Sequence, residues 1–137
     1  ELVRTGKSSP LRLLEECWAR IDEREPDVRA WVFVDRDYAR AQALQLEDEL
    51  KKGRRRGPLH GVPVGIKDIF DVEGWPTACG SKLWEHSYAR QDATVVRKLR
   101  DAGAVFVGKT VTTQYASFDP PVTRNPWGAT RTPGGSS

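Results

Sequence analysis

The sequence predicts a single α/β unit, and three observations support this fold class. The chain has 137 residues, about the length of one domain. Its composition, with 38% hydrophobic and 30% charged residues, is that of a globular protein with a buried core. Helix-like and strand-like segments alternate along the chain, which is typical of helices layered on a sheet.

The first half of the chain predicts two helices around a short strand. A helix is expected over about residues 10–24, because a serine precedes Pro10, and proline is favoured at the first helical position. The segment AWVFVD at 30–35 is aromatic and β-branched, which indicates a strand. Asp35 then caps a second helix at about 36–52. The apolar stripe of the first helix consists of Leu11, Leu14, Trp18 and Ile21.

The second half predicts a strand, a helix and another strand. Apolar residues alternate over about 62–67, which indicates a strand that ends at a lysine. A helix is expected over about 92–102, with Asp92 as its N-terminal cap. An apolar strand at about 104–108 follows it. A turn-rich loop then leads to the sequence PGGSS.

The segment GAVFVGKT at 103–110 matches the phosphate-loop pattern G-x-x-x-x-G-K-[ST]. A phosphate loop lies between a strand and a helix, and its free amides wrap the phosphates. Here Gly103 closes a helix, and AVFV is an apolar strand whose amides are expected to bond within the sheet. We therefore expect no nucleotide site in this segment.

Charge and hydropathy argue against two further classes of function. The net charge is +3, and five basic residues stand in KKGRRRG at 51–57. No aromatic residue interleaves these charges to stack on bases, so we expect a solvated loop and no direct contact with nucleic acid. No apolar run approaches the roughly 20 residues that span a bilayer, so no membrane association is expected.

The cysteines and histidines do not indicate a cofactor or a familiar triad. Cys17 and Cys79 have no metal-ligand spacing around them, so reduced thiols and a cytoplasmic location are expected. A disulfide between the two remains an open alternative. His60 and His86 lie outside any recognisable catalytic triad. Neither a metal nor an organic cofactor is implied.

Two features remain that can carry chemistry. Lys67 follows an apolar strand, where shielding from water favours the neutral, proton-accepting form of a lysine. The alternative is a lysine that reaches solvent or pairs with Asp68. The sequence GGSS at 134–137 combines flexible backbone with two hydroxyls that can relay protons. The alternative there is a flexible linker.

Three longer blocks resemble the amidase signature family when they are taken together. They are GPLHGVPVGIKDIFDVEGWPTACGS, DATVVRKLRDAGAVFVGKT and RNPWGATRTPGGSS. The resemblance continues upstream through ELVRTGKSSPLRLLEECWARIDEREPDVRAWV and covers nearly the whole chain. It implies an α/β/α layered fold, of which residues 1–137 are the N-terminal segment of one larger domain. It also implies amide hydrolysis through an acyl-enzyme and a Ser–cis-Ser–Lys triad, without a cofactor.

The resemblance assigns roles to individual residues. Lys67 matches the triad lysine, and Ser136 matches the bridging serine, whose peptide bond is cis in the family. The family's nucleophilic serine lies further along, so residues 1–137 alone are expected to be inactive. Val111 and Gln114 depart from common family residues, which leaves substrate preference open. Further expectations are support from Gly134, Gly135 and Ser137 and an acyl pocket at Ala116, Ser117 and Phe118.

The resemblance also leaves partners and function open between alternatives. A small-molecule amide is the expected substrate, with a homodimer or amidotransferase subunits as possible partners. Within the family, the alternative is the A subunit of a glutamyl-tRNA amidotransferase, which the basic residues 51–57 favour weakly. From another class, the alternative is a noncatalytic scaffold or binding fragment.

Overall fold

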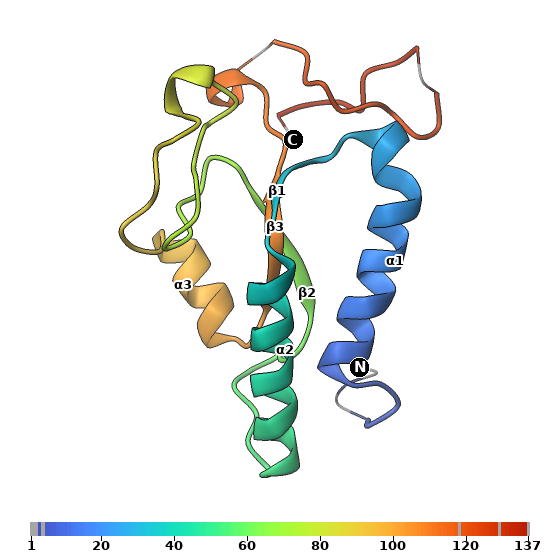
Figure 1. The fold of residues 1–137 in the computed structure, drawn as a ribbon, viewed down its shortest axis with the longest axis vertical. Coiled ribbons are helices and arrows are strands. Elements are labelled where there is room, and N and C mark those ends of the chain that lie inside the picture. Colours follow the sequence, from blue (N-terminus) through green and yellow to red (C-terminus); the bar gives the residue numbers. More distant parts are fainter. Residues whose placement is uncertain (1–2, 4, 118, 129, 137) are drawn as a thin grey trace.

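The structure places a three-stranded sheet between two layers of helices (Figure 1). It is a computed structural model, and it describes residues 3, 5–117, 119–128 and 130–136. The elements follow in the order α1 (Pro10–Val28), β1 (Trp31–Val34), α2 (Arg36–Lys51), β2 (Pro63–Lys67), α3 (Thr94–Asp101) and β3 (Val105–Thr110). Two short 3-10 turns, Lys82–Trp84 and Gln114–Ala116, lie in the loops.

Strand β3 is the central strand and organises both layers. It pairs in parallel with β2 and antiparallel with β1. Because successive side chains of a strand point to opposite faces, Val105 and Val107 pack with α1 and α2, whereas Phe106 packs on the side of α3. Figure 1 shows α1 and α3 on opposite sides of the sheet. This α/β/α arrangement confirms the predicted fold class. No helix among the described residues is long and apolar enough to cross a membrane.

Helix α1 ends four residues later than the sequence pattern predicts. Its end is fixed by a last helical hydrogen bond and by two hydrogen bonds to a side chain. The N–H of Arg29, which is in the left-handed conformation, donates to Glu25 O. The Glu25 carboxylate accepts from the backbone N–H groups of Ala30 and Trp31, at 3.0 and 2.8 Å. One carboxylate therefore joins the last turn of α1 to the start of β1.

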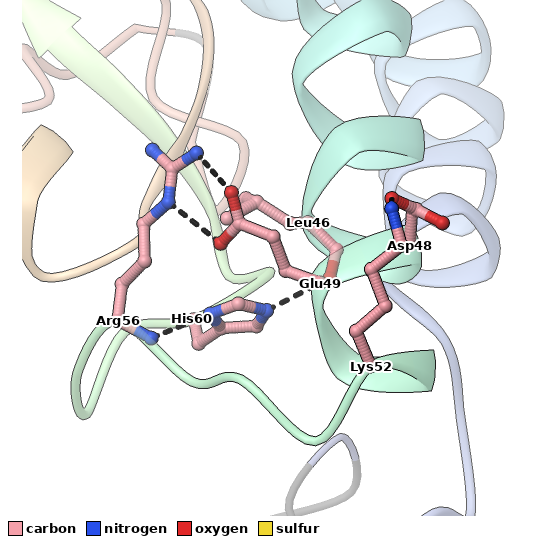
Figure 2. A network of polar contacts seen from close by, with 6 residues as sticks. All are labelled: Leu46, Asp48, Glu49, Lys52, Arg56 and His60. Atoms are coloured by element: carbon pink, nitrogen blue, oxygen red, sulfur yellow. Dashed lines mark hydrogen bonds and ion pairs between the residues drawn. The ribbon is translucent and has the colours of Figure 1, made fainter.

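The connection from α2 to β2 is anchored by a buried histidine (Figure 2). His60 Nδ1 accepts from Arg56 N at 3.1 Å, and its Nε2 lies 3.0 Å from Leu46 O. Since a carbonyl can only accept, Nε2 carries the proton. The Arg56 guanidinium also contacts both carboxylate oxygens of Glu49, at 2.9 and 2.6 Å. These contacts fix the segment that enters β2, the strand that carries Lys67.

The basic segment at 51–57 is largely neutralised by helix α2. Lys51 pairs with Glu47 at 3.4 Å, and Lys52 pairs with Asp48 at 2.6 Å. Arg56 uses the contact with Glu49 described above. Three of its five basic side chains therefore have carboxylate partners, which agrees with a solvated loop beside a helix.

Helix α3 starts without the predicted side-chain cap. Ala93 is its N-cap, and no side chain bonds there. Instead, the Asp92 carboxylate accepts from Glu73 N at 2.8 Å and from the Arg100 guanidinium at 2.7 and 2.9 Å. The prediction of Asp92 as a cap is wrong because its carboxylate oxygens instead bind Glu73 N and the side chain of Arg100, near the other end of α3. The hydrogen bonds from Arg100 lower the pKa of Asp92.

The segment that resembles a phosphate loop is a strand in the structure. Gly103 has a φ of +90° after α3, and β3 then runs through Gly108 and Lys109 to Thr110, two residues past the predicted end. At Gly108 the chain approaches β1 so closely that a Cβ would lie 2.1 Å from Phe33 O. The second glycine of the pattern thus serves strand packing.

Gly108→Ala is expected to destabilise the protein because the added methyl group collides with the backbone of β1. We expect the free energy of unfolding to fall by at least about 2 kcal/mol, as in other overpacked cores. Urea denaturation measures this change. Gly128→Ala is the matched control, since the nearest atom to its Cβ is 3.7 Å away, and we expect a change within about 0.5 kcal/mol. Equal midpoints for both variants would contradict the close approach.

Asp92→Asn is expected to lower stability in a pH-dependent manner. At pH 7 the loss of charge on one side of a side-chain pair only 9% and 28% exposed costs about 1–3 kcal/mol. The folded-state pKa of Asp92 is lowered, so its stabilisation is present above the ordinary carboxyl range. The stabilisation is lost as the pH falls through the folded-state pKa. Urea denaturation at neutral and acid pH should show the cost shrinking in acid.

The control for this experiment is Asp27→Asn, an exposed carboxylate with no ion pair among the described residues. It should change stability little at either pH. A cost of Asp92→Asn that stays constant between neutral and acid pH would contradict the role of the Arg100 ion pair.

Candidate active site

Lys67 lies at the carboxyl end of β2, where the strand leaves the sheet. It is half-buried and pairs with Thr110 in the parallel register of β2 and β3. Its Nζ donates a hydrogen bond to Ser136 Oγ. The two residues are separated by 69 positions in sequence, and Figure 1 shows the C-terminal end of the described chain returning to this end of the sheet. The structure therefore brings the two sequence-predicted side chains into contact.

Ser136 is held by the residues that follow β3. Its carbonyl accepts from Thr113 N at 3.0 Å and from Thr112 Oγ1 at 2.7 Å. The peptide bond between Gly135 and Ser136 is cis, and Gly134 has a φ of +96°. Gly134 and Gly135 are exposed and lead the chain back toward β3. Ser137, which the resemblance assigns a supporting role, lies outside the described residues.

A buried ion pair joins Asp68, the residue after Lys67, to Lys109 of β3. Lys109 is 0% exposed, and its Nζ lies 2.9 Å from Asp68 Oδ1. The same nitrogen donates to Pro76 O at 2.8 Å and to Thr77 Oγ1 at 3.0 Å. Asp68 is 2% exposed. The sequence alternative in which Asp68 pairs with Lys67 is therefore not what the structure contains: Asp68 pairs with Lys109.

The loop after β2 and the turn after β3 are joined by main-chain hydrogen bonds. Cys79 N donates to Asp68 O at 3.0 Å, and Tyr115 N donates to Cys79 O at 2.8 Å. The Tyr115 hydroxyl contacts Ser81 Oγ at 3.1 Å. Burial, and then the charge of Asp68, raise the pKa of the Cys79 thiol. The raised pKa disfavours the thiolate, which is the nucleophilic form of a cysteine.

A cavity of about 480 Å³ opens beside this network. Its lining includes Asp68, Ser81, Thr112, Thr113 and Gln114. Asp68 Oδ2 makes no hydrogen bond with any described residue.

The predicted acyl-pocket residues lie next to this cavity in sequence. Ala116 and Ser117 are exposed in the turn after β3 and do not line the cavity. Thr113 Oγ1 donates to Ser117 O at 2.7 Å, which fixes the turn. Phe118 lies outside the described residues. Their role in binding an acyl group stays a prediction.

Sequence reasoning missed three residues of this site, namely Lys109, Thr112 and Thr113. Lys109 was visible only as part of an accidental motif. Its apolar neighbours, AVFVG on one side and TV on the other, are the signal that this lysine would be buried and need a partner. Thr112 and Thr113 carry no such signal. Their bonds to Ser136 form only because residues far along the chain fold back beside the end of β3. Among the described residues, no group of three metal-binding side chains is present.

The chain matches the Amidase family over residues 12–137. It is 46% identical to the A subunit of the glutamyl-tRNA(Gln) amidotransferase from Acidothermus cellulolyticus, over 86% of this chain and 25% of that protein. It is 39% identical to the corresponding protein from Carboxydothermus hydrogenoformans, which has the same name, over 100% of this chain and 30% of that protein. The chain thus spans under a third of the length of these relatives.

Solved structures of the same family have the same fold over this segment. A crystal structure of an amidase superposes with a TM-score of 0.89 at 38% identity, over 98% of this chain and 32% of that chain. The native peptide amidase from Stenotrophomonas maltophilia superposes with a TM-score of 0.88 at 33% identity, over 98% of this chain and 30% of that chain. On the match over residues 12–137 and this shared fold, the chain belongs to the Amidase family, the amidase signature enzymes.

Proposed function

We propose that this chain supplies the lysine base and the bridging serine of an amide hydrolase that works through an acyl-enzyme. The observation that carries the proposal is the contact between Lys67 Nζ and Ser136 Oγ. A base and a hydroxyl within hydrogen-bond reach are the arrangement that activates a nucleophile. The family membership supports the same reaction class. The proposed substrate is a small-molecule amide.

The proposed chemistry is a two-step proton relay. Neutral Lys67 takes the proton of the Ser136 hydroxyl, which in turn takes a proton from the nucleophilic serine. That serine attacks the amide carbonyl, and the relay returns the proton to the departing amine. Water then releases the acyl group. We propose that the nucleophile lies outside residues 1–137, so that this segment alone does not turn over. No step needs a metal or an organic cofactor.

We further propose that the residues around Ser136 shape the substrate site. The exposed Gly134 and Gly135 would let an amide approach the bridging serine closely, and Ser137 would support the hydrogen-bond network of that serine. Ala116, Ser117 and Phe118 would contact the acyl group. The cavity of about 480 Å³, which Gln114 lines just before these residues in sequence, is of the size that ordinary small-molecule sites have.

Lys67→Met in the full-length protein is expected to lower kcat/KM for a simple amide by at least about 100-fold, because the base of the relay is lost. Ser136→Ala is expected to act in the same direction. Release of ammonia or amine from the substrate measures both. Lys98→Met, at an exposed lysine of α3, is the matched control and should leave the rate unchanged. Wild-type rates in the Lys67 variant would reject the proposed function of Lys67 as the base, whereas no amide hydrolysis by the wild-type protein would favour a noncatalytic scaffold.

A second candidate is the amide-hydrolysing component of a glutamyl-tRNA amidotransferase. It is favoured by the curated relatives, two of which are 46% and 39% identical and carry that name. In this case the chain would act with companion subunits. We propose no direct contact of this segment with RNA, because three of the five basic side chains at 51–57 already pair with α2.

The two candidates differ in substrate and in assembly. An amidotransferase component should copurify with companion subunits when the full-length protein is isolated from its own cells. It should then release ammonia from glutamine faster in their presence than alone. A full-length protein that purifies alone and hydrolyses other amides, with no glutamine-dependent ammonia, would reject this candidate and keep the first.

A further inference from the structure

The Asp68–Lys109 pair is the most deeply buried charge pair among the described residues, and the proposed reaction does not use it. Its side chains are 3% and 0% exposed. Lys109 Nζ is fully occupied, because it contacts Asp68 Oδ1 and donates to Pro76 O and Thr77 Oγ1. Removing two charges from water is costly unless they are paired and hydrogen-bonded. Lys109 Nζ meets that condition, whereas Asp68 Oδ2 makes no hydrogen bond with any described residue.

Strand register places Asp68 one residue after Lys67 and across from the end of β3, which carries Lys109. In the parallel pairing of β2 with β3, Ile66 faces Lys109 and Lys67 faces Thr110. Asp68 follows Lys67 directly, and its N–H donates to Thr110 O at 3.0 Å. Of the two lysines, Lys109 takes the carboxylate, and Lys67 bonds the Ser136 hydroxyl instead.

We propose that Lys109 is a positioning residue of this active site, because it engages Asp68 and so leaves Lys67 available to Ser136. The inference rests on the proposed function. With Lys109 in place, the charges of Lys109 and Asp68 cancel each other. Without it, an unpaired carboxylate next to Lys67 would hold that lysine in its charged form, which cannot accept a proton.

Other charged and titratable groups lie around the pair, and Lys82, Glu85 and Asp119 line the same cavity as Asp68. Cys79 approaches from the loop after β2, and Asp71 from the turn that follows Asp68. The charges of Asp68 and Asp71 raise the pKa of the Cys79 thiol, and the charge of Lys109 lowers it. Strand β1 faces this region with Phe33 and Val34, which carry no charge. The charges of Asp68 and Lys109 thus act on a third group, the Cys79 thiol, as well as on each other.

The test compares pH–rate profiles of four full-length proteins: wild type, Lys109→Met, Asp68→Asn and the double variant. We expect the acidic limb of kcat/KM to move to higher pH by about one unit in Lys109→Met, since the remaining carboxylate favours charged Lys67. In Asp68→Asn the remaining Lys109 cation should move the limb to lower pH. The double variant should return close to wild type.

Shifts of opposite sign are a result that a purely structural role would not give. Leu14→Ala, which empties a buried site on α1, is the stability control and should leave the midpoint in place. If Lys109→Met does not fold, Asp68→Asn against the double variant carries the same test, because loss of the lysine charge must raise the midpoint again.

Two outcomes separate this inference from the proposed function. Identical midpoints in all variants, or shifts in the same direction, would overturn the inference while Lys67→Met remained inactive. An active Lys67→Met protein would instead reject the proposed function, whatever the midpoints.

Discussion

The parallel pairing of β2 with β3 determines the geometry of the whole site. Parallel strands end at the same edge of a sheet, so the last residue of β2, Lys67, and the residues after β3, Thr112 and Thr113, meet there. The threonines then hold the carbonyl of Ser136. All residues of β3 except the last are buried in the sheet between the helices. A catalytic contact between distant residues thus follows from one strand pairing.

Buried polar side chains, more than apolar ones, fix the loops around this pairing. His60 joins the segment before β2 to helix α2 through Leu46 O and Arg56 N. Lys109 joins β3 to the loop at 76–77. Such groups are costly inside a protein unless each donor and acceptor has a partner. Because hydrogen bonds require a particular direction and apolar contacts do not, these polar groups restrict the positions of the loops more than apolar contacts do.

Local patterns in the sequence predicted the elements but not the contacts between them. Period and capping residues located the helices and strands, because these depend on neighbours a few residues away. The end of α1 was missed because the Glu25 carboxylate bonds to Ala30 and to Trp31, the first residue of β1. Asp92 was misread because its partner is Arg100. The link between Lys67 and Ser136 had no local signal at all, and only the family resemblance suggested it.

The ion pairs along α2 have a consequence for the molecule's electrostatic surface. Only Arg54 and Arg55 of the segment at 51–57 keep side chains without an ion pair among the described residues. Two free cations displace about two counterions from a polyanion, so binding there would weaken only about tenfold when the salt concentration rises fourfold. The basic residues at 51–57 therefore produce only a weak positive potential, and a nucleic-acid backbone would gain little binding free energy by contacting them.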